Sequence, residues 1–167
     1  MHLEYKKLVP SAQPPERNKI ADAGWDLRSL EYHSLSPGQQ VSVHTGLAIQ
    51  LSPDPDSPDE QKLYSPDTGL FTYYLRIAGK SGLADKHGIH IAGGVVDRGY
   101  TGEIVVILAN LGFYMNGQLV SRPFEVNIGD KIAQLVPTII PRITHSLIVD
   151  EFPVTERGDA GFGSSGV

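Results

Sequence analysis

The chain has 167 residues, enough for one domain with a proper hydrophobic core. Its formal net charge of -5 argues against duplex DNA or RNA as a partner, because proteins that bind duplexes usually present a basic face. It contains no cysteine, which excludes disulfides and thiolate metal sites. The 18 glycines and 12 prolines are more than a helical bundle would tolerate and favour an all-β fold rich in turns.

The N-terminal residues 1–7 lack the apolar core of a signal peptide, and no apolar run approaches the length that spans a membrane. We therefore expect an intracellular protein, in the cytoplasm or the nucleus, that binds neither a membrane nor nucleic acid directly. A first strand is expected at residues 3–8, followed by a proline-containing loop that runs to Asn18.

Apolar side chains occupy the odd positions of residues 41–51 on both sides of Thr45, which is the period-two pattern of half-buried strands. This pattern predicts a β-hairpin that turns at Thr45 and Gly46. The following residues 52–69 are acidic and contain four prolines, so they are expected to form an exposed loop.

Short strands are expected to dominate the rest of the chain. They are predicted where apolar residues alternate or run together, at residues 71–77, 103–109, 124–128, 131–136 and 147–149. The run at 103–109 should be a buried central strand, and a turn is expected at Gly129 and Asp130. One short helix is expected at residues 82–86, capped by Ser81 and ended by Gly88. This spacing predicts a jelly-roll-like β-barrel or sandwich, with a mobile C-terminal arm after Pro153.

The first segment that carries chemistry places Gly24 between Asp22 and Asp26. A glycine beside two acids suggests a tight turn into a strand, with carboxylates close to it. The alternative interpretation is an ordinary turn with solvated acids.

The second segment places Lys80, Ser81 and Gly82 at the start of the expected helix. The backbone N–H groups, the helix dipole and the ammonium group would all favour an anion there. The alternative is plain helix capping beside a surface lysine. The segment is no P-loop, because the glycine spacing of that motif is missing.

The third segment, residues 94–103, predicts a β-hairpin that turns at Arg98 and Gly99. Asp97 ends an apolar strand, so its carboxylate should lie at the edge of a partly dry pocket, where a general base would act. Tyr100 on the opposite arm would pack flat against a ligand ring. The alternative is a turn-stabilising aspartate and a core tyrosine.

The fourth segment surrounds Gln134, and the fifth is the C-terminal tail; both contain polar side chains that could bind a ligand. Gln134 lies among apolar residues and needs a hydrogen-bond partner, either a ligand or a backbone group. Residues 157–166 hold one Arg, one Phe, two Ser and several Gly, and have no face that could pack. Arg157 offers a fork for phosphate and Phe162 a flat face for a base. The alternative for this tail is a plain flexible linker.

These five segments, in this order and at this spacing, resemble the five motifs of the trimeric dUTPase family, the deoxyuridine 5′-triphosphate nucleotidohydrolases. The match runs from about residue 21 to residue 166. The resemblance implies a β domain at residues 1–152 and an arm at 153–167 that closes over an active site of a neighbouring subunit. It implies a homotrimer whose sites each take motifs from all three subunits.

The resemblance also implies the reaction, in which water attacks the α-phosphate of dUTP to give dUMP and pyrophosphate. This hydrolysis keeps uracil out of DNA and supplies dUMP for thymidylate synthesis. Asp97 matches the residue that activates the water, and Tyr100 matches the one that packs under the deoxyribose and excludes a 2′-hydroxyl. The backbone of Gly94, Val95 and Val96 matches the segment that reads the uracil edge.

The resemblance also covers the positions that bind the phosphates of dUTP and the Mg²⁺ ion. The substrate-binding positions implied for the phosphates and for the closing tail are Lys80, Ser81, Gly82, Gln134, Arg157, Phe162, Gly163, Ser164 and Ser165. Asp26 matches the aspartate that acts near Mg²⁺ through water, and Mg²⁺ is the implied cofactor. Lys80 departs from the family's usual Arg, which keeps the charge but loses bidentate geometry.

Two alternatives remain from the sequence. A dCTP deaminase of the same superfamily would use a glutamate as its acid and base and would lack the pair Asp97 and Tyr100. A binding protein that uses dUTP as a switch would contact a regulatory protein partner through residues 52–69, which are longer than the usual connection there.

Overall fold

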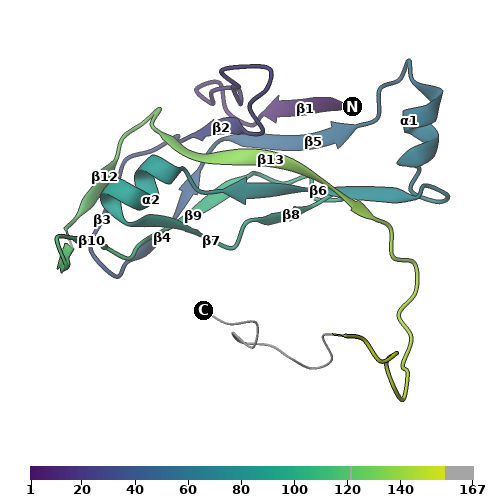
Figure 1. Cartoon of the computed structure of the whole chain (residues 1–167). Coiled ribbons are helices and arrows are strands. Elements are labelled where there is room, and N and C mark those ends of the chain that lie inside the picture. Colours follow the sequence, from purple (N-terminus) through teal and green to yellow (C-terminus); the bar gives the residue numbers. More distant parts are fainter. Residues whose placement is uncertain (121, 157–167) are drawn as a thin grey trace.

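The computed structural model describes residues 1–120 and 122–156, and within them the all-β expectation is confirmed (Figure 1). The elements are β1 (His2–Lys7), β2 (Trp25–Arg28), β3 (His33–Leu35), β4 (Gln40–His44), β5 (Leu47–Ser52), α1 (Pro58–Leu63), β6 (Phe71–Ala78), α2 (Ser81–His87), β7 (Ile89–Ala92), β8 (Val95–Asp97), β9 (Val105–Asn110), β10 (Phe113–Met115), β11 (Gln118–Val120), β12 (Phe124–Val126) and β13 (Lys131–Pro141). No helix in these residues is long and apolar enough to cross a membrane.

The strands form a jelly-roll-like set of small sheets. The largest sheet has the order β2-β13-β6-β8, and β13 runs along the length of the molecule beside β6 (Figure 1). A second sheet has the order β4-β9-β7, and β1 with β5, β3 with β12 and β10 with β11 form antiparallel pairs. The mostly antiparallel, mostly short strands are the architecture that the turn-rich composition favours.

The core is built from the alternating apolar positions that predict the strands. Val106 and Leu108 of β9 are completely buried, and β9 lies between β4 and β7, so the expectation of a buried central strand is confirmed. Leu135 of β13 and Leu75 of β6 are buried in the same core. Each such side chain stabilises the fold by roughly 1.5–3 kcal/mol, so these strands hold the site in place.

The hairpin expected at residues 41–51 is wrong in its pairing, although both of its strands exist. β4 pairs with β9 and β5 pairs with β1. Between them, the Thr45 hydroxyl donates to the carbonyl of Ile104 at 2.6 Å, and Gly46, at a φ of 69°, fits where a Cβ would meet Ala12 at 2.8 Å. Alternation is a local pattern, whereas the partner of a strand is decided by distant residues.

Residues 52–69 are not only a loop, because they contain the helix α1. Ser57 caps it by accepting from the N–H of Glu60 at 3.4 Å, and Pro58 opens its first turn. The expected cap of α2 is also wrong: Ser81 is the first helical residue, and Lys80 stands at the cap position without a side-chain cap bond. Gly88 ends α2 in the left-handed conformation, with a φ of 65°, as expected.

The strand expected at residues 147–149 is absent from the described residues, where β13 is followed by extended chain that leaves the body (Figure 1). Leu147 is 84% and Ile148 is 100% exposed. Alternation predicts an extended segment but cannot supply its partner. The turn before β13 falls at Ile128 and Gly129, so Ile128 belongs to the turn and not to the strand.

Candidate active site

A cavity of about 330 Å³ opens beside β8 and gathers the residues of the third segment. Its walls include all five of the substrate and catalytic residues expected there, which are Gly94, Val95, Val96, Asp97 and Tyr100. β8 is the outermost strand of its sheet, and no described strand pairs with its outer edge. An unpaired strand edge offers backbone N–H and C=O groups to a ligand.

The backbone at the start of β8 requires glycine. Gly94 has a φ of 118°, and its carbonyl accepts from the N–H of Ile77 at 2.8 Å. A Cβ at this position would lie 2.6 Å from the carbonyl oxygen of Ile77. Gly94 therefore lets the chain leave β7 and reach the edge of β6, which is how β8 comes to face the cavity.

Asp97 lies at the end of β8, paired in register with Tyr74 of β6. Its side chain is exposed and lines the cavity, whose other walls include the apolar side chains of Ile104 and Ile107. Within the described part of the chain, its carboxylate accepts no hydrogen bond and joins no ion pair, which leaves both oxygens free for a water or a ligand.

The hairpin expected around Arg98 and Gly99 is a turn only. The N–H of Tyr100 donates to the carbonyl of Asp97 at 3.0 Å and closes the turn, but β8 pairs with β6, whereas β9 pairs with β4 and β7. Tyr100 and Asp97 nevertheless line the same cavity. The turn, and not strand pairing, brings them together.

Tyr100 is held by residues whose role the sequence did not reveal. Its hydroxyl donates to the carbonyl of Glu103 at 2.9 Å, and a Cβ on Gly102 would lie 2.5 Å from that hydroxyl. The Glu103 carboxylate accepts from the N–H of Gly46 at 2.7 Å and contacts Nδ1 of His44 at 2.9 Å. The segment under the Tyr100 ring is thereby tied to the chain crossing between β4 and β5.

A second cavity, of about 320 Å³, gathers the residues of the other segments. It is lined by Gly24, Asp26, Lys80 and Gln134, together with Asn18, Asp22 and Ala23. The register of the large sheet explains this: Asp26 of β2 and Ala78 of β6 both pair with Gln134 of β13. Ser81 and Gly82 follow Lys80 as the exposed first residues of α2, outside the cavity wall.

Glycine makes room for the amide of Gln134. A Cβ on Gly24 would lie 2.8 Å from the Gln134 side-chain oxygen, so the amide lies against the backbone at Gly24. In the described residues that amide has no hydrogen-bond partner. The amide lies in the cavity wall, where it is accessible to water or to a ligand.

Asp26 lies between two ammonium groups. Lys80 approaches one of its oxygens at 2.5 Å and Lys131 the other at 2.6 Å, and the Asp26 side chain is only 15% exposed. Burial by itself would raise the pKa of the Asp26 carboxyl, but the hydrogen bonds and charges of Lys131 and Lys80 outweigh it and lower that pKa below its usual value. The two ammonium groups compensate the Asp26 charge, and Lys80 remains in the wall of the cavity, where a phosphate could contact it.

The donor set around Asp26 fits a metal only at a distance. Both carboxylate oxygens are already in contact with lysine, and no group of three His, Asp or Glu that could hold an ion occurs in the described residues. Mg²⁺ prefers water and phosphate oxygens to an all-protein cage. The arrangement therefore agrees with a water-mediated role of Asp26 and not with direct ligation.

The two cavities have no lining residue in common. One holds the candidate base and sugar-side residues, and the other the candidate phosphate-side residues. The tail positions Arg157, Phe162, Gly163, Ser164 and Ser165 lie outside the described residues. A single chain thus presents two separate halves of the expected site.

Comparison with known proteins decides the family. The dUTPase family model matches residues 65–166. The deoxyuridine 5′-triphosphate nucleotidohydrolase of Clostridium novyi is 37% identical over 171 residues and covers 100% of both chains. The chain belongs to the dUTPase family.

Two solved phage dUTPases are similar to the chain. The dUTPase of Staphylococcus bacteriophage 80alpha with dUPNHPP has a TM-score of 0.75 and 29% identity, with 99% of both chains covered. It is described as one of the phage dUTPases that control the transfer of virulence genes by a proto-oncogenic G protein-like mechanism. A single-site mutant of the dUTPase from phage phi11 of S. aureus has a TM-score of 0.66 and 28% identity, covers 92% and 100% of the two chains, and shows how a structural Mg(II) ion is coordinated.

For this dUTPase, sequence reasoning missed Lys131 and the support under Tyr100. Lys131 is the first residue of β13, and its place at the start of a predicted strand was the available signal, whereas its pairing beside β2 is visible only in the structure. Gly102 and Glu103 stand within the third segment, but only the folded chain shows their contacts with Tyr100 and Gly46.

Proposed function

We propose that the chain, which as a dUTPase hydrolyses dUTP to dUMP and pyrophosphate, activates the attacking water with the carboxylate of Asp97. The observation that carries this proposal is the cavity that joins Asp97 and Tyr100 to the free edge of β8. The carboxylate has no described partner, so it can take a proton from a water directed at the α-phosphate. This reaction keeps uracil out of DNA and supplies dUMP for thymidylate synthesis.

The same cavity supports the choice of base and sugar. The backbone at Gly94, Val95 and Val96 belongs to an edge strand and would bond the polar edge of uracil. The ring of Tyr100, fixed by its bond to Glu103, would lie under the deoxyribose and leave no space for a 2′-hydroxyl. A fixed aromatic ring clashes with a 2′-hydroxyl, and this clash weakens the binding of a ribonucleotide more than a flexible ring would.

The phosphates belong to the other cavity. Lys80 and Gln134 line it, and the N–H groups of Ser81 and Gly82 open α2 beside it. The Lys80 ammonium group and the backbone N–H donors of Ser81 and Gly82 would offset part of the charge of a triphosphate. When bound, Mg²⁺ supplies further neutralisation of phosphate charge, and Asp26 would meet its water shell.

A homotrimer with shared sites would bring the two cavities together. One protomer keeps them separate, and its residues 142–156 leave the body with Leu147 and Ile148 exposed. Exposed apolar side chains on an extended segment favour docking on another copy. The arm at residues 153–167 would then carry Arg157, Phe162, Gly163, Ser164 and Ser165 over the active site of a neighbouring subunit. The Phe162 ring would stack on uracil there.

The experiment is pyrophosphate release from dUTP with Mg²⁺, measured beside dCTP, dTTP and UTP. We expect release from dUTP alone. Asp97→Asn should keep dUTP binding and lose about a hundredfold or more in kcat. Asp56→Asn, a matched change of an exposed aspartate in the segment before α1, should keep full activity. A fully active Asp97→Asn enzyme would remove Asp97 from the role of base.

A second candidate function is regulation through residues 52–69. The observation that favours it is α1, a capped helix with Asp59 and Glu60 in its first turn, on a segment that is mostly exposed. The similar phage 80alpha dUTPase is described as a regulator of gene transfer. A pulldown with the intact chain and with residues 55–66 replaced by a short Gly-Ser linker tests this role. Equal recovery of every partner by both chains would exclude it.

The proposed place of this activity is inside the cell, in the cytoplasm or the nucleus. A chain without cysteine has no disulfide to gain from an oxidising compartment, and dUTP is an intracellular nucleotide. Cell fractionation with an antibody against the chain tests this. Recovery in the medium alone would contradict it.

A further inference from the structure

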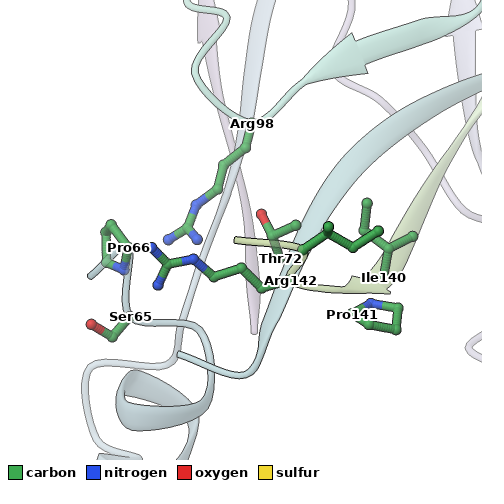
Figure 2. Close-up of a pocket in the computed structure, with 8 residues that line it drawn as sticks. Ser65, Pro66, Thr72, Arg98, Ile140, Pro141 and Arg142 are labelled. Atoms are coloured by element: carbon green, nitrogen blue, oxygen red, sulfur yellow. The ribbon is translucent and has the colours of Figure 1, made fainter. Parts of the chain in front are cut away.

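A third cavity, of about 380 Å³, lies where β13 ends and the chain turns away from the body of the protein. Its walls include Ser65 and Pro66, which follow α1, Thr72 of β6, and the side chains of Arg98 and Arg142 (Figure 2). It shares no lining residue with either half of the candidate active site. Two arginines in one cavity supply the charge and the forked donors that suit an anion.

Arg98 is fixed in place before any ligand arrives. Its guanidinium lies 4.6 Å from the centroid of the Tyr73 ring, and one of its NH₂ groups donates to the carbonyl of Tyr64 at 2.8 Å. Tyr73 is only 6% exposed, so the surface on which the guanidinium stacks is part of the core. The side-chain entropy of Arg98 is therefore lost on folding and not on binding, which favours a preorganised site.

Arg142 approaches the same space from the other side. Its backbone N–H donates to the carbonyl of Leu70 at 2.9 Å, which anchors the residue at the end of the sheet. Figure 2 shows its guanidinium directed toward that of Arg98, beside Pro66. Within residues 1–120 and 122–156, no acidic side chain forms an ion pair with either arginine. Two facing cations without a counter-ion create a positive potential that an anion would relieve.

We propose that this cavity binds a phosphate-class oxyanion between Arg98 and Arg142, with the Thr72 hydroxyl in the same wall. Planar guanidinium groups donate paired N–H bonds that match the oxygens of a tetrahedral anion. Two such forks offer more donors than one carboxylate can accept, which favours phosphate over an acidic side chain. The anion is either free inorganic phosphate or the phosphate group of a nucleotide, since both present the same oxygens.

This proposal gives residues 52–69 a structural part that a plain surface loop would not have. The carbonyl of Tyr64 orients Arg98, and Ser65 and Pro66 form one wall of the cavity. The segment thus supplies one wall of the proposed site and holds Arg98, which directly follows Asp97 in the chain. The proposed anion site does not depend on the assignment of the reaction.

The test is calorimetric titration of the full chain with inorganic phosphate, pyrophosphate and dUMP. The wild type should bind phosphate, and Arg142→Gln should weaken the binding at this site about tenfold or more. Arg76→Gln is the matched control, because Arg76 is an exposed arginine of neighbouring β6 that lines none of the described cavities. Because dUMP can also bind at the candidate active site, the comparison is the loss caused by Arg142→Gln: a larger loss for dUMP than for phosphate would identify the nucleotide as the source, and an equal loss the free ion.

The candidate active site also receives phosphates, so a positional readout is needed. Crystals soaked in selenate should show an anomalous peak between the two guanidinium groups. Because Arg142 begins the segment that leaves the body, Arg142→Gln could also change that segment. Arg98→Lys provides a second variant: it keeps the charge but loses the stacked guanidinium fork, and it should lower the anomalous peak. The proposal is overturned if the wild type shows no peak there, for example because a carboxylate of a second copy fills the cavity. Unchanged phosphate binding by Arg142→Gln would overturn it as well.

Discussion

Glu103 is the residue on which the position of Tyr100 depends. Its carboxylate binds the N–H of Gly46 and the ring of His44, and its carbonyl accepts the Tyr100 hydroxyl. Glu103→Ala should loosen the segment under the ring, so that KM for dUTP rises and the discrimination against UTP falls about tenfold or less. The ratio of kcat/KM for dUTP and UTP measures this. Glu125→Ala, a change at an exposed position of β12, should leave the ratio unchanged.

The same contact makes stability depend on pH through His44. The hydrogen bond and the charge of Glu103 raise the pKa of His44 above its ordinary value of 6.5. A raised pKa in the folded state stabilises the protein below the ordinary pKa, and this contribution is lost as the pH rises through the raised value. The Tm difference between wild type and His44→Gln should therefore be larger at a pH of about 5.5 than at about 8.5. An equal difference at both pH values would contradict the ion pair.

The residue scale also shows what sequence could reveal about the site. Asp97 and Tyr100 stand three residues apart, and one turn is enough to bring them together, so a sequence motif captures them. The contact between Asp26 and Lys80 joins residues 54 positions apart through the register of three strands. A motif marks each of these residues as special but cannot show that one neutralises the other.

At the scale of elements, α1 is the helix that the sequence should have revealed. Ser57 and Glu60 have the spacing of a capping box, and Pro58 suits the first helical position. The four prolines of residues 52–69 favour a loop, so composition alone predicts no helix there although Ser57 and Glu60 indicate one. The strands were predictable because alternation over 71–77 reports burial directly, whereas the pairing of β4 with β9 requires knowledge of the whole fold.

The capping bond of α1 gives a testable cost. Ser57→Ala removes the acceptor for the N–H of Glu60 and should lower the free energy of unfolding by roughly 0.5–1 kcal/mol. Ser42→Ala, at an exposed position of β4, is the matched control and should change stability little. Urea denaturation midpoints compare the two. If Ser57→Ala unfolds like the control, the cap does not stabilise α1.

At the scale of the whole molecule, the separation of the two cavities decides how many chains a site needs. If one active site takes Asp97 from one subunit and Gln134 from another, then the Asp97→Asn and Gln134→Ala substitutions affect residues that two different subunits contribute to that site. Each variant alone should be nearly inactive. After the two are unfolded together and refolded, about a quarter of the sites would combine an intact Asp97 with an intact Gln134, because each comes from a random neighbour.

The recovered activity distinguishes the two arrangements without a structure of the assembly. A site built within one chain always contains one of the two substitutions, so mixing would restore nothing. A site shared between subunits should regain about a quarter of the wild-type rate in the mixed sample. Wild type carried through the same refolding measures the yield, and each variant refolded alone gives the baseline. Because the two cavities of one protomer share no wall, the shared arrangement is the one that we expect.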